Sequence, residues 1–277
     1  MADCPSFAVV VDTGSNAELY NLAIVSGDHG GLDGIDVWGN NIHVHDVMVT
    51  NKDECVTVKS PSNGVLVEQI YCNWSGGCAI GSLGASTAIE NVQYRKIYTW
   101  QSNQMMMIKS NGGSGYAKSM SFSDFIGHNN AYSLNIDQAW SGQSVATGSG
   151  VKLSGISFSN WHGDCANGVQ RGPIQFKCDA DVPCTGMAVS NFALGTLTGS
   201  QEKYICANAF GSGACLKSGS GSYTSTSTLA AAPTGTSAAK MPWDRTASVG
   251  FANPIPIPSM PSYFYPGTTP LKALAGS

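Results

Sequence analysis

The sequence predicts an all-β fold, specifically a single-stranded, right-handed parallel β-helix. Apolar residues (h) recur in the pattern h-x-x-h-x-h at intervals of 23 to 36 residues, apolar and polar residues alternate inside each unit, and Gly, Asn and Ser separate the units. A drifting period of this length is typical of a solenoid of stacked coils. A β-sandwich of hairpins is less favoured, because tight Asn-Gly and Asp-Gly turns are scarce. The central apolar positions are Leu22, Val47, Ile70, Ile97, Phe125, Trp161 and Phe192.

Composition limits the classes of function. The 277 residues are 42% hydrophobic and 12% charged, and the net charge is -4 without a basic block. Nothing in this balance attracts phosphate backbones, so no nucleic-acid partner is expected. No apolar run reaches the roughly 18 residues needed to cross a bilayer, so no membrane association is expected. The first residues contain no secretion signal. We expect a monomer.

The composition changes along the chain and predicts three segments. Residues 1–216 carry the repeats and form the predicted β-helix. Residues 217–240 are rich in Ser, Thr, Gly and Ala and are predicted to be a flexible linker. Residues 241–277 form a Pro-spaced tail that contains enough apolar residues to pack back along the helix.

The nine cysteines favour an oxidising compartment outside the cell, because no metal-like pair is present. Spacing suggests the disulfides Cys178–Cys184 and Cys206–Cys215, each closing a small loop. Cys55–Cys72 is the third candidate and is expected to tie an acidic segment to the next coil. The remaining cysteines are Cys4, Cys78 and Cys165. The orphan Cys4 suggests that the chain begins partway into a longer domain.

Acidic residues occupy corresponding places in two successive β-like segments. When Asp33-Gly34-Ile35-Asp36-Val37 is written above Glu54-Cys55-Val56-Thr57-Val58, Asp33 lies over Glu54, and Asp53 precedes Glu54. Carboxylates gathered in this way repel one another, so at least one should have a raised pKa. One acid and one base suit glycoside hydrolysis. Ordinary solvated turn residues are the alternative interpretation.

Other polar motifs are weaker. His43, His45 and Asp46 resemble a metal cluster, but they alternate with apolar residues and are predicted to line the outer face of a strand. Neither a metal nor a cofactor is therefore expected. Asn73 lies in the single Asn-x-Ser/Thr sequon and is a candidate glycosylation site, although a glycan there might obstruct a groove.

Four stretches carry a resemblance to a known family. They are Gly30–Gly39, Val47–Pro61, Tyr71–Gly84 and Ser102–Gly113. These stretches closely resemble fungal rhamnogalacturonan hydrolases of the polygalacturonase superfamily, glycoside hydrolase family 28. The resemblance covers most of the chain, with further coils in the family before Cys4. It implies a secreted glycosidase that cleaves the galacturonate-to-rhamnose bond of pectic rhamnogalacturonan.

The resemblance also implies catalytic roles. Polygalacturonases carry Asn-Thr-Asp where this chain has Gly31-Leu32-Asp33, and Asp-Asp where it has Asp53-Glu54. Asp53 would then be the general acid, and Asp33 and Glu54 would activate water. Such enzymes resemble inverting glycosidases, for which the acid and base should lie about 6.5–9.5 Å apart.

Departures from the polygalacturonase pattern bear on the substrate. A family Gly-His-Gly corresponds to Ser75-Gly76-Gly77, and a family Arg-Ile-Lys corresponds to Met107-Ile108-Lys109. An Arg there would grip a uronate carboxylate, whereas Met can pack against the methyl group of rhamnose. The expected substrate-binding residues are Lys109, Met107, Gly76, Gly77 and Asp137. Two of them have an alternative interpretation: Met107 as a core residue and Asp137 as a solvated turn residue.

Three alternative functions remain. One is a polygalacturonase or xylogalacturonan hydrolase, and the second is a truncated, inactive β-helical protein that only binds pectin. A lyase on the same fold is the third, but it would need a calcium site and a strong base near the uronate α-carbon.

Overall fold

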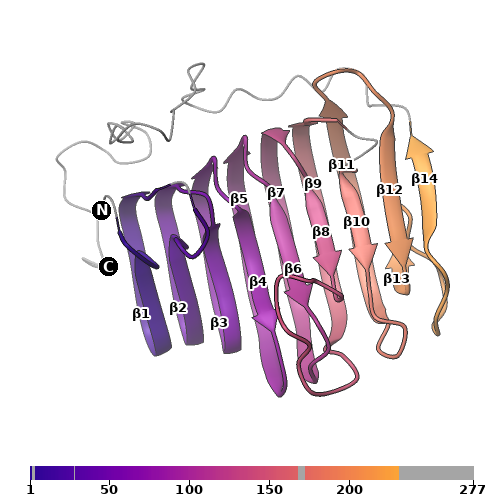
Figure 1. Cartoon of the computed structure of the whole chain (residues 1–277), viewed down its shortest axis with the longest axis horizontal. Coiled ribbons are helices and arrows are strands. Elements are labelled where there is room, and N and C mark those ends of the chain that lie inside the picture. Colours follow the sequence, from indigo (N-terminus) through magenta and orange to yellow (C-terminus); the bar gives the residue numbers. More distant parts are fainter. Residues whose placement is uncertain (2–3, 28, 168–171, 231–277) are drawn as a thin grey trace.

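The computed structural model describes residues 1, 4–27, 29–167 and 172–230, and these ranges contain strands and connecting turns but no helix that could cross a membrane. The strands run side by side from β1 to β14 (Figure 1). Their bounds are β1 Val9–Val25, β2 Ile35–Thr50, β3 Glu54–Asn73, β4 Gly77–Leu83, β5 Thr87–Trp100, β6 Met106–Ser110, β7 Gly115–Asn130, β8 Leu134–Asp137, β9 Lys152–Cys165, β10 Ile174–Lys177, β11 Cys184–Thr196, β12 Glu202–Ala207, β13 Ala209–Ser212 and β14 Thr226–Ala230.

The strands form a parallel β-helix, as the sequence predicts. The long strands β1, β2 and β3 pair in parallel, and from β3 the ladder divides into two. One branch runs β3-β5-β7-β9-β11-β13 and the other runs β3-β4-β6-β8-β10-β12-β14. Among the described residues the paired strands are parallel, except that β12 and β14 are antiparallel. Each coil therefore contributes a strand to both branches.

The predicted repeat is confirmed residue by residue. Leu22 pairs with Val47, Val47 with Ile70, and the register continues through every central position to Phe192. Buried aromatic rings stack along this column, with the centroids of Phe125 and Trp161 4.2 Å apart and their planes 3° apart. Residues separated by one period thus become direct neighbours along the helix.

A bend in each coil comes directly before the central apolar position. The residue at this bend has a left-handed φ of 47° to 58° in seven successive coils, which Asn and Asp tolerate better than most residues. Side chains in this column bond to one another: Asn160 donates to Asp124 Oδ1 at 3.0 Å and accepts from Asn191 Nδ2 at 2.7 Å. The bend residues are Asn21, Asp46, Gln69, Lys96, Asp124, Asn160 and Asn191.

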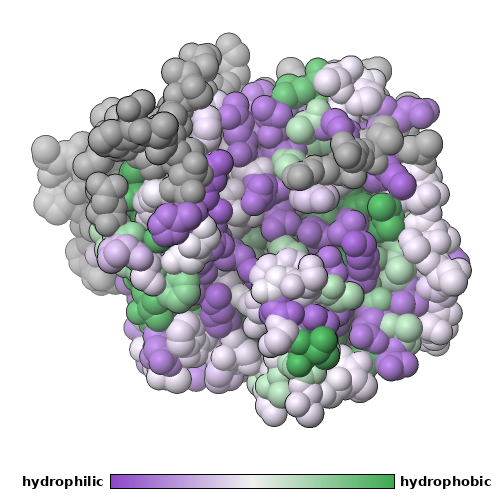
Figure 2. All heavy atoms as spheres, viewed as in Figure 1, coloured by the Kyte–Doolittle hydropathy of each residue, from purple (hydrophilic) through white to green (hydrophobic). Residues whose placement is uncertain are grey.

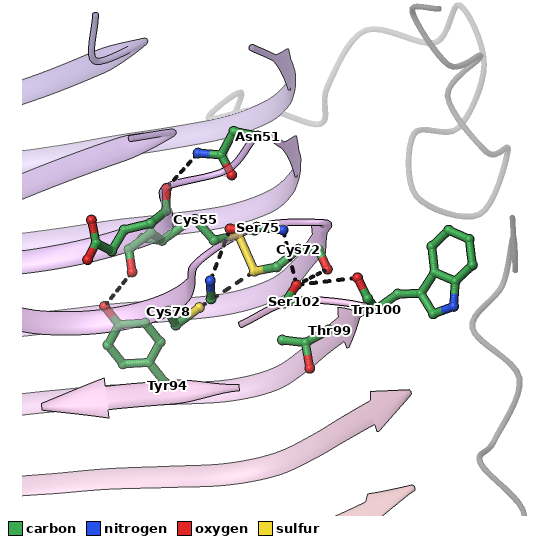
Figure 3. Close-up of a disulfide and its surroundings, with 12 residues drawn as sticks. Asn51, Cys55, Cys72, Ser75, Cys78, Tyr94, Thr99, Trp100 and Ser102 are labelled. Carbon is green, nitrogen blue, oxygen red and sulfur yellow. Dashed lines mark hydrogen bonds between the residues drawn. A yellow bond between two sulfur atoms is a disulfide. The ribbon is translucent and has the colours of Figure 1, made fainter. Parts of the chain in front are cut away.

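The three predicted disulfides are present, each with a Cα–Cα distance of 5.7 Å. One detail of the prediction is wrong: Cys55 and Cys72 are both in β3, so their disulfide closes a single coil and does not tie two coils together (Figure 3). The two ends of a coil approach each other because the chain makes a complete turn. Cys78 lies beside this bridge, with its Sγ 3.8 Å from Cys72 Sγ, and burial raises the pKa of its thiol to about 12.

Part of the predicted linker, residues 217–230, lies within the described residues and includes one strand. Thr226–Ala230 form β14, which pairs with β12, and Tyr223 bonds to Asn208 and Ala209. The small polar residues of this segment include Thr, which is suited to a half-exposed edge strand. Residues 231–240 of the predicted linker and the predicted tail, residues 241–277, lie outside the described residues.

The bend column supplies a stability test. Asn160→Ala removes two side-chain hydrogen bonds and places a Cβ-bearing residue without a polar side chain at φ 58°, so we expect a loss of about 1–3 kcal/mol in unfolding free energy. Asn160→Gly loses the same hydrogen bonds without the backbone strain and should cost about 1 kcal/mol less. Denaturant unfolding measures both. Equal losses for Ala and Gly would show that the left-handed conformation contributes nothing.

Candidate active site

The acidic residues lie where two neighbouring coils turn into β2 and β3. Asp33 comes two residues before β2, Asp53 lies on the following turn, and Glu54 begins β3. Gly34 N donates to Glu54 O at 2.8 Å, which holds the two coils together at this level. The buried amide of Asn51 adds bonds from Nδ2 to Leu32 O at 2.7 Å and to Glu54 O at 2.9 Å. Backbone pairing therefore places these side chains together.

Both the carboxyl group and the backbone carbonyl of Asp53 accept hydrogen bonds. Its Oδ1 accepts from Glu54 N at 3.0 Å, and its Oδ2 accepts from Gly31 N. Its carbonyl oxygen accepts from Gly76 N at 2.7 Å and from Ser75 Oγ at 2.9 Å. The position of this carboxyl group is consequently defined by three neighbouring segments.

The three predicted acids form a compact group. One carboxylate oxygen from each of Asp33, Asp53 and Glu54 lies within 4.8 Å of the others. They lie close together because Asp53 and Glu54 are consecutive and the coil spacing brings Asp33 beside them. This limit applies to one oxygen of each group, whereas the expected spacing of about 6.5–9.5 Å separates whole carboxyl groups, so the expected spacing stays a prediction.

Two lysines neutralise part of this acidic group. Lys109, buried in β6, forms an ion pair and hydrogen bond with Glu54 Oε1, and its Nζ lies 4.4 Å from the centroid of the Trp140 ring. Lys59 Nζ lies 3.7 Å from Asp33 Oδ2 and 3.2 Å from Asp36 Oδ2. Three carboxylates at this spacing can in general hold a hard cation. Here the ammonium groups of Lys59 and Lys109 already balance part of the negative charge, so we assign no metal to the site.

Burial and charge shift the pKa of the aspartates upward. Burial raises the pKa of Asp33 to about 7, with the negative charges of Asp36 and Asp53 adding to the effect and Lys59 opposing it. Burial, together with the hydrogen bond and charge of Glu54, raises the pKa of Asp53 to about 6. Burial also raises the pKa of Asp36. The site therefore holds protons at a pH where ordinary carboxyl groups are ionised.

A pocket of about 340 Å³ contains two of the predicted substrate-binding residues, Met107 and Asp137. Met107 is 5% exposed and its Sδ lies 3.0 Å from Gln104 Nε2, so it is mostly buried yet contributes to the wall. Asp137 Oδ2 lies 3.8 Å from Lys177 Nζ. The lining residues are Asn103, Gln104, Met107, Tyr132, Asn135, Asp137, Trp140, Gln175 and Lys177.

This pocket adjoins the acids through Lys109 and Trp140. Trp140 both lines the pocket and lies under the ammonium that binds Glu54. Lys109 also pairs in register with Asp137, and Asp137 with Lys177, on successive coils. The acids and the pocket thus belong to one continuous series of coils.

In the view of Figure 2 hydrophilic residues are interspersed with small apolar areas and no large apolar patch appears.

Gly76 and Gly77 are buried beneath the acids. A Cβ at Gly76 would lie 2.9 Å from Asp53 C, and one at Gly77, where φ is +91°, would lie 1.9 Å from Gln104 O. These glycines allow the backbone to approach Asp53 and the next coil closely. Their predicted contact with a sugar remains a prediction.

Asn73, the candidate glycosylation site, is 1% exposed, and its Nδ2 is buried without a hydrogen-bond partner. A glycan on this nitrogen would require the side chain to leave its present position. The structure therefore gives a physical reason against a glycan at Asn73 in the folded chain.

Sequence reasoning missed several polar residues of the site. Lys59 and Asp36 lie inside the stretches discussed above, and their places in the alternating pattern were the available signal. No sequence pattern indicated Trp140 or Gln175 as site residues. Trp140 lies in the loop after the short strand β8, and Gln175 belongs to a coil whose period departs from the others.

The chain is similar in sequence to several curated fungal proteins. The chain is 56% identical to "Rhamnogalacturonase A" of Aspergillus aculeatus, with 100% of the chain and 63% of that protein covered. It is 55% identical to "Rhamnogalacturonase A" of Emericella nidulans, covering 100% and 55% respectively. It is 57% identical to "Probable rhamnogalacturonase B" of Neosartorya fischeri, covering 99% and 54%. The chain therefore spans a little more than half the length of these relatives.

Two solved structures share the fold. An endo-xylogalacturonan hydrolase from Aspergillus tubingensis superposes with a TM-score of 0.68 at 24% identity, covering 79% of this chain and 63% of that one. An exopolygalacturonase from Thermotoga maritima superposes with a TM-score of 0.52 at 17% identity, covering 82% and 53%.

The model of one family matches most of the chain. That family is described as "Glycosyl hydrolases family 28", and the match extends over residues 1–216, which include all the acids and the pocket described above. With this match and relatives of 55–57% identity, the chain belongs to glycosyl hydrolases family 28.

Proposed function

We propose that the protein hydrolyses the galacturonic acid to rhamnose linkage of the rhamnogalacturonan backbone of pectin. The observation that carries this proposal is the compact group of Asp33, Asp53 and Glu54 beside a pocket walled by Met107. Relatives at 55–57% identity are named rhamnogalacturonases, which agrees with that substrate. A pectic polymer fits a site extended along stacked coils better than a small metabolite does.

The ionisation pattern divides the chemical roles. Asp53, whose pKa is raised to about 6, holds a proton in mildly acidic solution and is placed to donate it to the departing glycosidic oxygen. Glu54 forms an ion pair and a hydrogen bond with the ammonium of Lys109, which orients its carboxylate. Glu54 is therefore the base that takes a proton from water, and Asp33, with its pKa raised to about 7, holds that water through a hydrogen bond.

We propose single displacement with inversion. Two carboxyl groups, Asp33 and Glu54, are available to hold one water molecule, whereas a covalent mechanism needs a single nucleophile. The 4.8 Å limit between the nearest oxygens is the observation that favours a retaining mechanism as the second candidate. The configuration of the first product separates the two.

The pocket suggests how the two sugars are distinguished. Met107 presents a thioether where a charged group would grip a uronate, and it suits the methyl group of rhamnose. Polar groups from neighbouring coils, among them Gln175 and Lys177, are available to the carboxylate and hydroxyls of galacturonate. Lys109 binds Glu54, so its role is to hold the base, with contact to galacturonate through its remaining donors.

The disulfides bear on the compartment in which the protein acts. Disulfides persist in oxidising compartments, and three of them support action outside the cell. We also propose that the protein acts as a monomer.

The direct test is incubation of the purified chain with de-esterified rhamnogalacturonan and, separately, with homogalacturonan. We expect cleavage of rhamnogalacturonan only, with galacturonate at the new reducing end and, by ¹H NMR, the inverted anomer formed first. Product sizing and identification of the reducing ends complete the measurement.

Other outcomes of this experiment point to other functions. Cleavage of homogalacturonan alone would favour a polygalacturonase, and a retained first anomer would overturn the assignment of the water-activating groups. An unsaturated product with new ultraviolet absorbance would indicate a lyase. Binding without turnover would contradict the proposal and favour a pectin-binding protein.

Substitution of Met107 tests the specificity argument. Met107→Arg places an unpaired charge in the pocket, and we expect kcat/KM on rhamnogalacturonan to fall by about tenfold or more. Met107→Leu keeps the apolar volume and should remain within a few-fold of the parent. Should the Arg variant match the Leu variant, Met107 does not line the subsite for rhamnose.

A further inference from the structure

A second cluster of ionisable side chains lies on the outer face of β1, β2 and β3. His43 and His45 alternate with the buried Ile42 and Val44, so both imidazoles point away from the core, as the sequence predicts. Glu18 of β1 pairs in register with His43. This arrangement brings together three side chains from two coils that the catalytic proposal does not use.

One nitrogen of each imidazole faces the same carboxylate oxygen. His45 Nε2 lies 2.8 Å from Glu18 Oε1, and His43 Nδ1 lies 3.7 Å from it. One ligand atom from each of the three residues lies within 4.8 Å of the others, and all three side chains are partly open to solvent. In a tetrahedral zinc site with bonds near 2.0–2.1 Å, ligand atoms lie about 3.3 Å apart. The two distances from Glu18 Oε1, 2.8 Å and 3.7 Å, lie on either side of this value.

The other nitrogen of each imidazole is anchored by a different carboxylate. His45 Nδ1 lies 2.7 Å from Asp46 Oδ2, and His43 Nε2 lies 3.0 Å from Glu68 Oε1. A carboxylate behind a histidine fixes the ring and its tautomer and leaves the opposite nitrogen free to bind a metal.

The anchoring carboxylates are themselves held by the next coils. Gln69 Nε2 donates to Asp46 Oδ1 at 2.6 Å, and Arg95 Nε donates to Glu68 Oε2 at 2.8 Å. The Tyr20 ring also stacks on His45, with centroids 5.2 Å apart and planes 7° apart. The two imidazoles are therefore preorganised and not merely close on an exposed surface.

The two imidazoles direct one nitrogen each toward Glu18. A neutral imidazole has one N–H, so it can donate to one carboxylate, and its second nitrogen then presents a lone pair. Both nitrogens of both rings face carboxylates here, and the ring centroids lie 4.3 Å apart. When the N–H groups point to Asp46 and Glu68, the lone pairs of His45 Nε2 and His43 Nδ1 lie beside Glu18 Oε1.

We propose that Glu18, His43 and His45 bind a divalent transition-metal cation of the zinc type, with a fourth position left for water. Two imidazoles and one carboxylate suit Zn²⁺, Ni²⁺ or Cu²⁺ and are a poor ligand set for Ca²⁺ or Mg²⁺. Because His43, His45 and Asp46 alternate with apolar residues, no metal was expected from the sequence. The structure adds Glu18 from the preceding coil and turns Asp46 into the group that orients His45. Bound metal would fasten β1 to β2.

The test uses the full 277-residue chain after treatment with a chelator. We expect isothermal titration to give one Zn²⁺ per chain, no matching isotherm with Ca²⁺, and a rise in melting temperature with added Zn²⁺. His45→Gln and Glu18→Gln should each lose the high-affinity isotherm. Asp46→Asn, which does not touch the metal, should weaken affinity by about 10–100-fold.

His162→Gln is the matched control, because it removes a half-buried histidine of β9 outside the cluster and should leave Zn²⁺ affinity unchanged. Circular dichroism and metal-free melting verify that each variant folds. Zn²⁺ binding that survives in both His45→Gln and Glu18→Gln would overturn the proposal, as would the absence of any Zn²⁺ isotherm in the parent chain. In either case the cluster is a set of ion pairs only.

Discussion

In-register stacking of parallel coils is the constraint on which the rest of this structure depends. Each strand pairs with the coil before and the coil after it, so residues one period apart lie at the strand spacing of about 4.8 Å. Asp33 and Glu54 become neighbours for this reason, and so do Glu18 and His43. The catalytic group and the histidine cluster are thus two products of the same register.

Stacking also makes the carboxyl groups chemically unequal. Asp33 is buried beside other acids, Asp53 accepts hydrogen bonds from backbone amides, and Glu54 forms an ion pair with Lys109. This inequality has a thermodynamic consequence. The folded pKa of Asp33 is about 7 against an ordinary value near 3.9, so the folded protein binds this proton more tightly than the unfolded chain does. The resulting stabilisation is fully present below about pH 4 and is lost as pH rises through 7, so the site costs stability where its carboxylates are charged.

Much of this architecture was predictable from sequence because its determinants are periodic. The column from Leu22 to Phe192 and the placement of Asp33 over Glu54 follow from counting residues, and short cysteine spacings gave the disulfide partners. Features that depend on irregular segments were not predictable. Trp140 lies in a loop outside the period, and the strand Thr226–Ala230 resembles a linker in composition. The ion pair of Glu54 with Lys109 joins residues 55 positions apart, so no local pattern indicated it.

The central claim is that coil stacking gives three adjacent carboxyl groups different ionisation states. Carboxyl ¹³C NMR titration of the chain labelled at Asp and Glu tests it most directly, with Asp33→Asn, Asp53→Asn and Glu54→Gln assigning the signals. The account predicts that Asp53 titrates near pH 6 and Asp33 near pH 7. Titration of Asp33 and Asp53 at their ordinary values near 4 would contradict it.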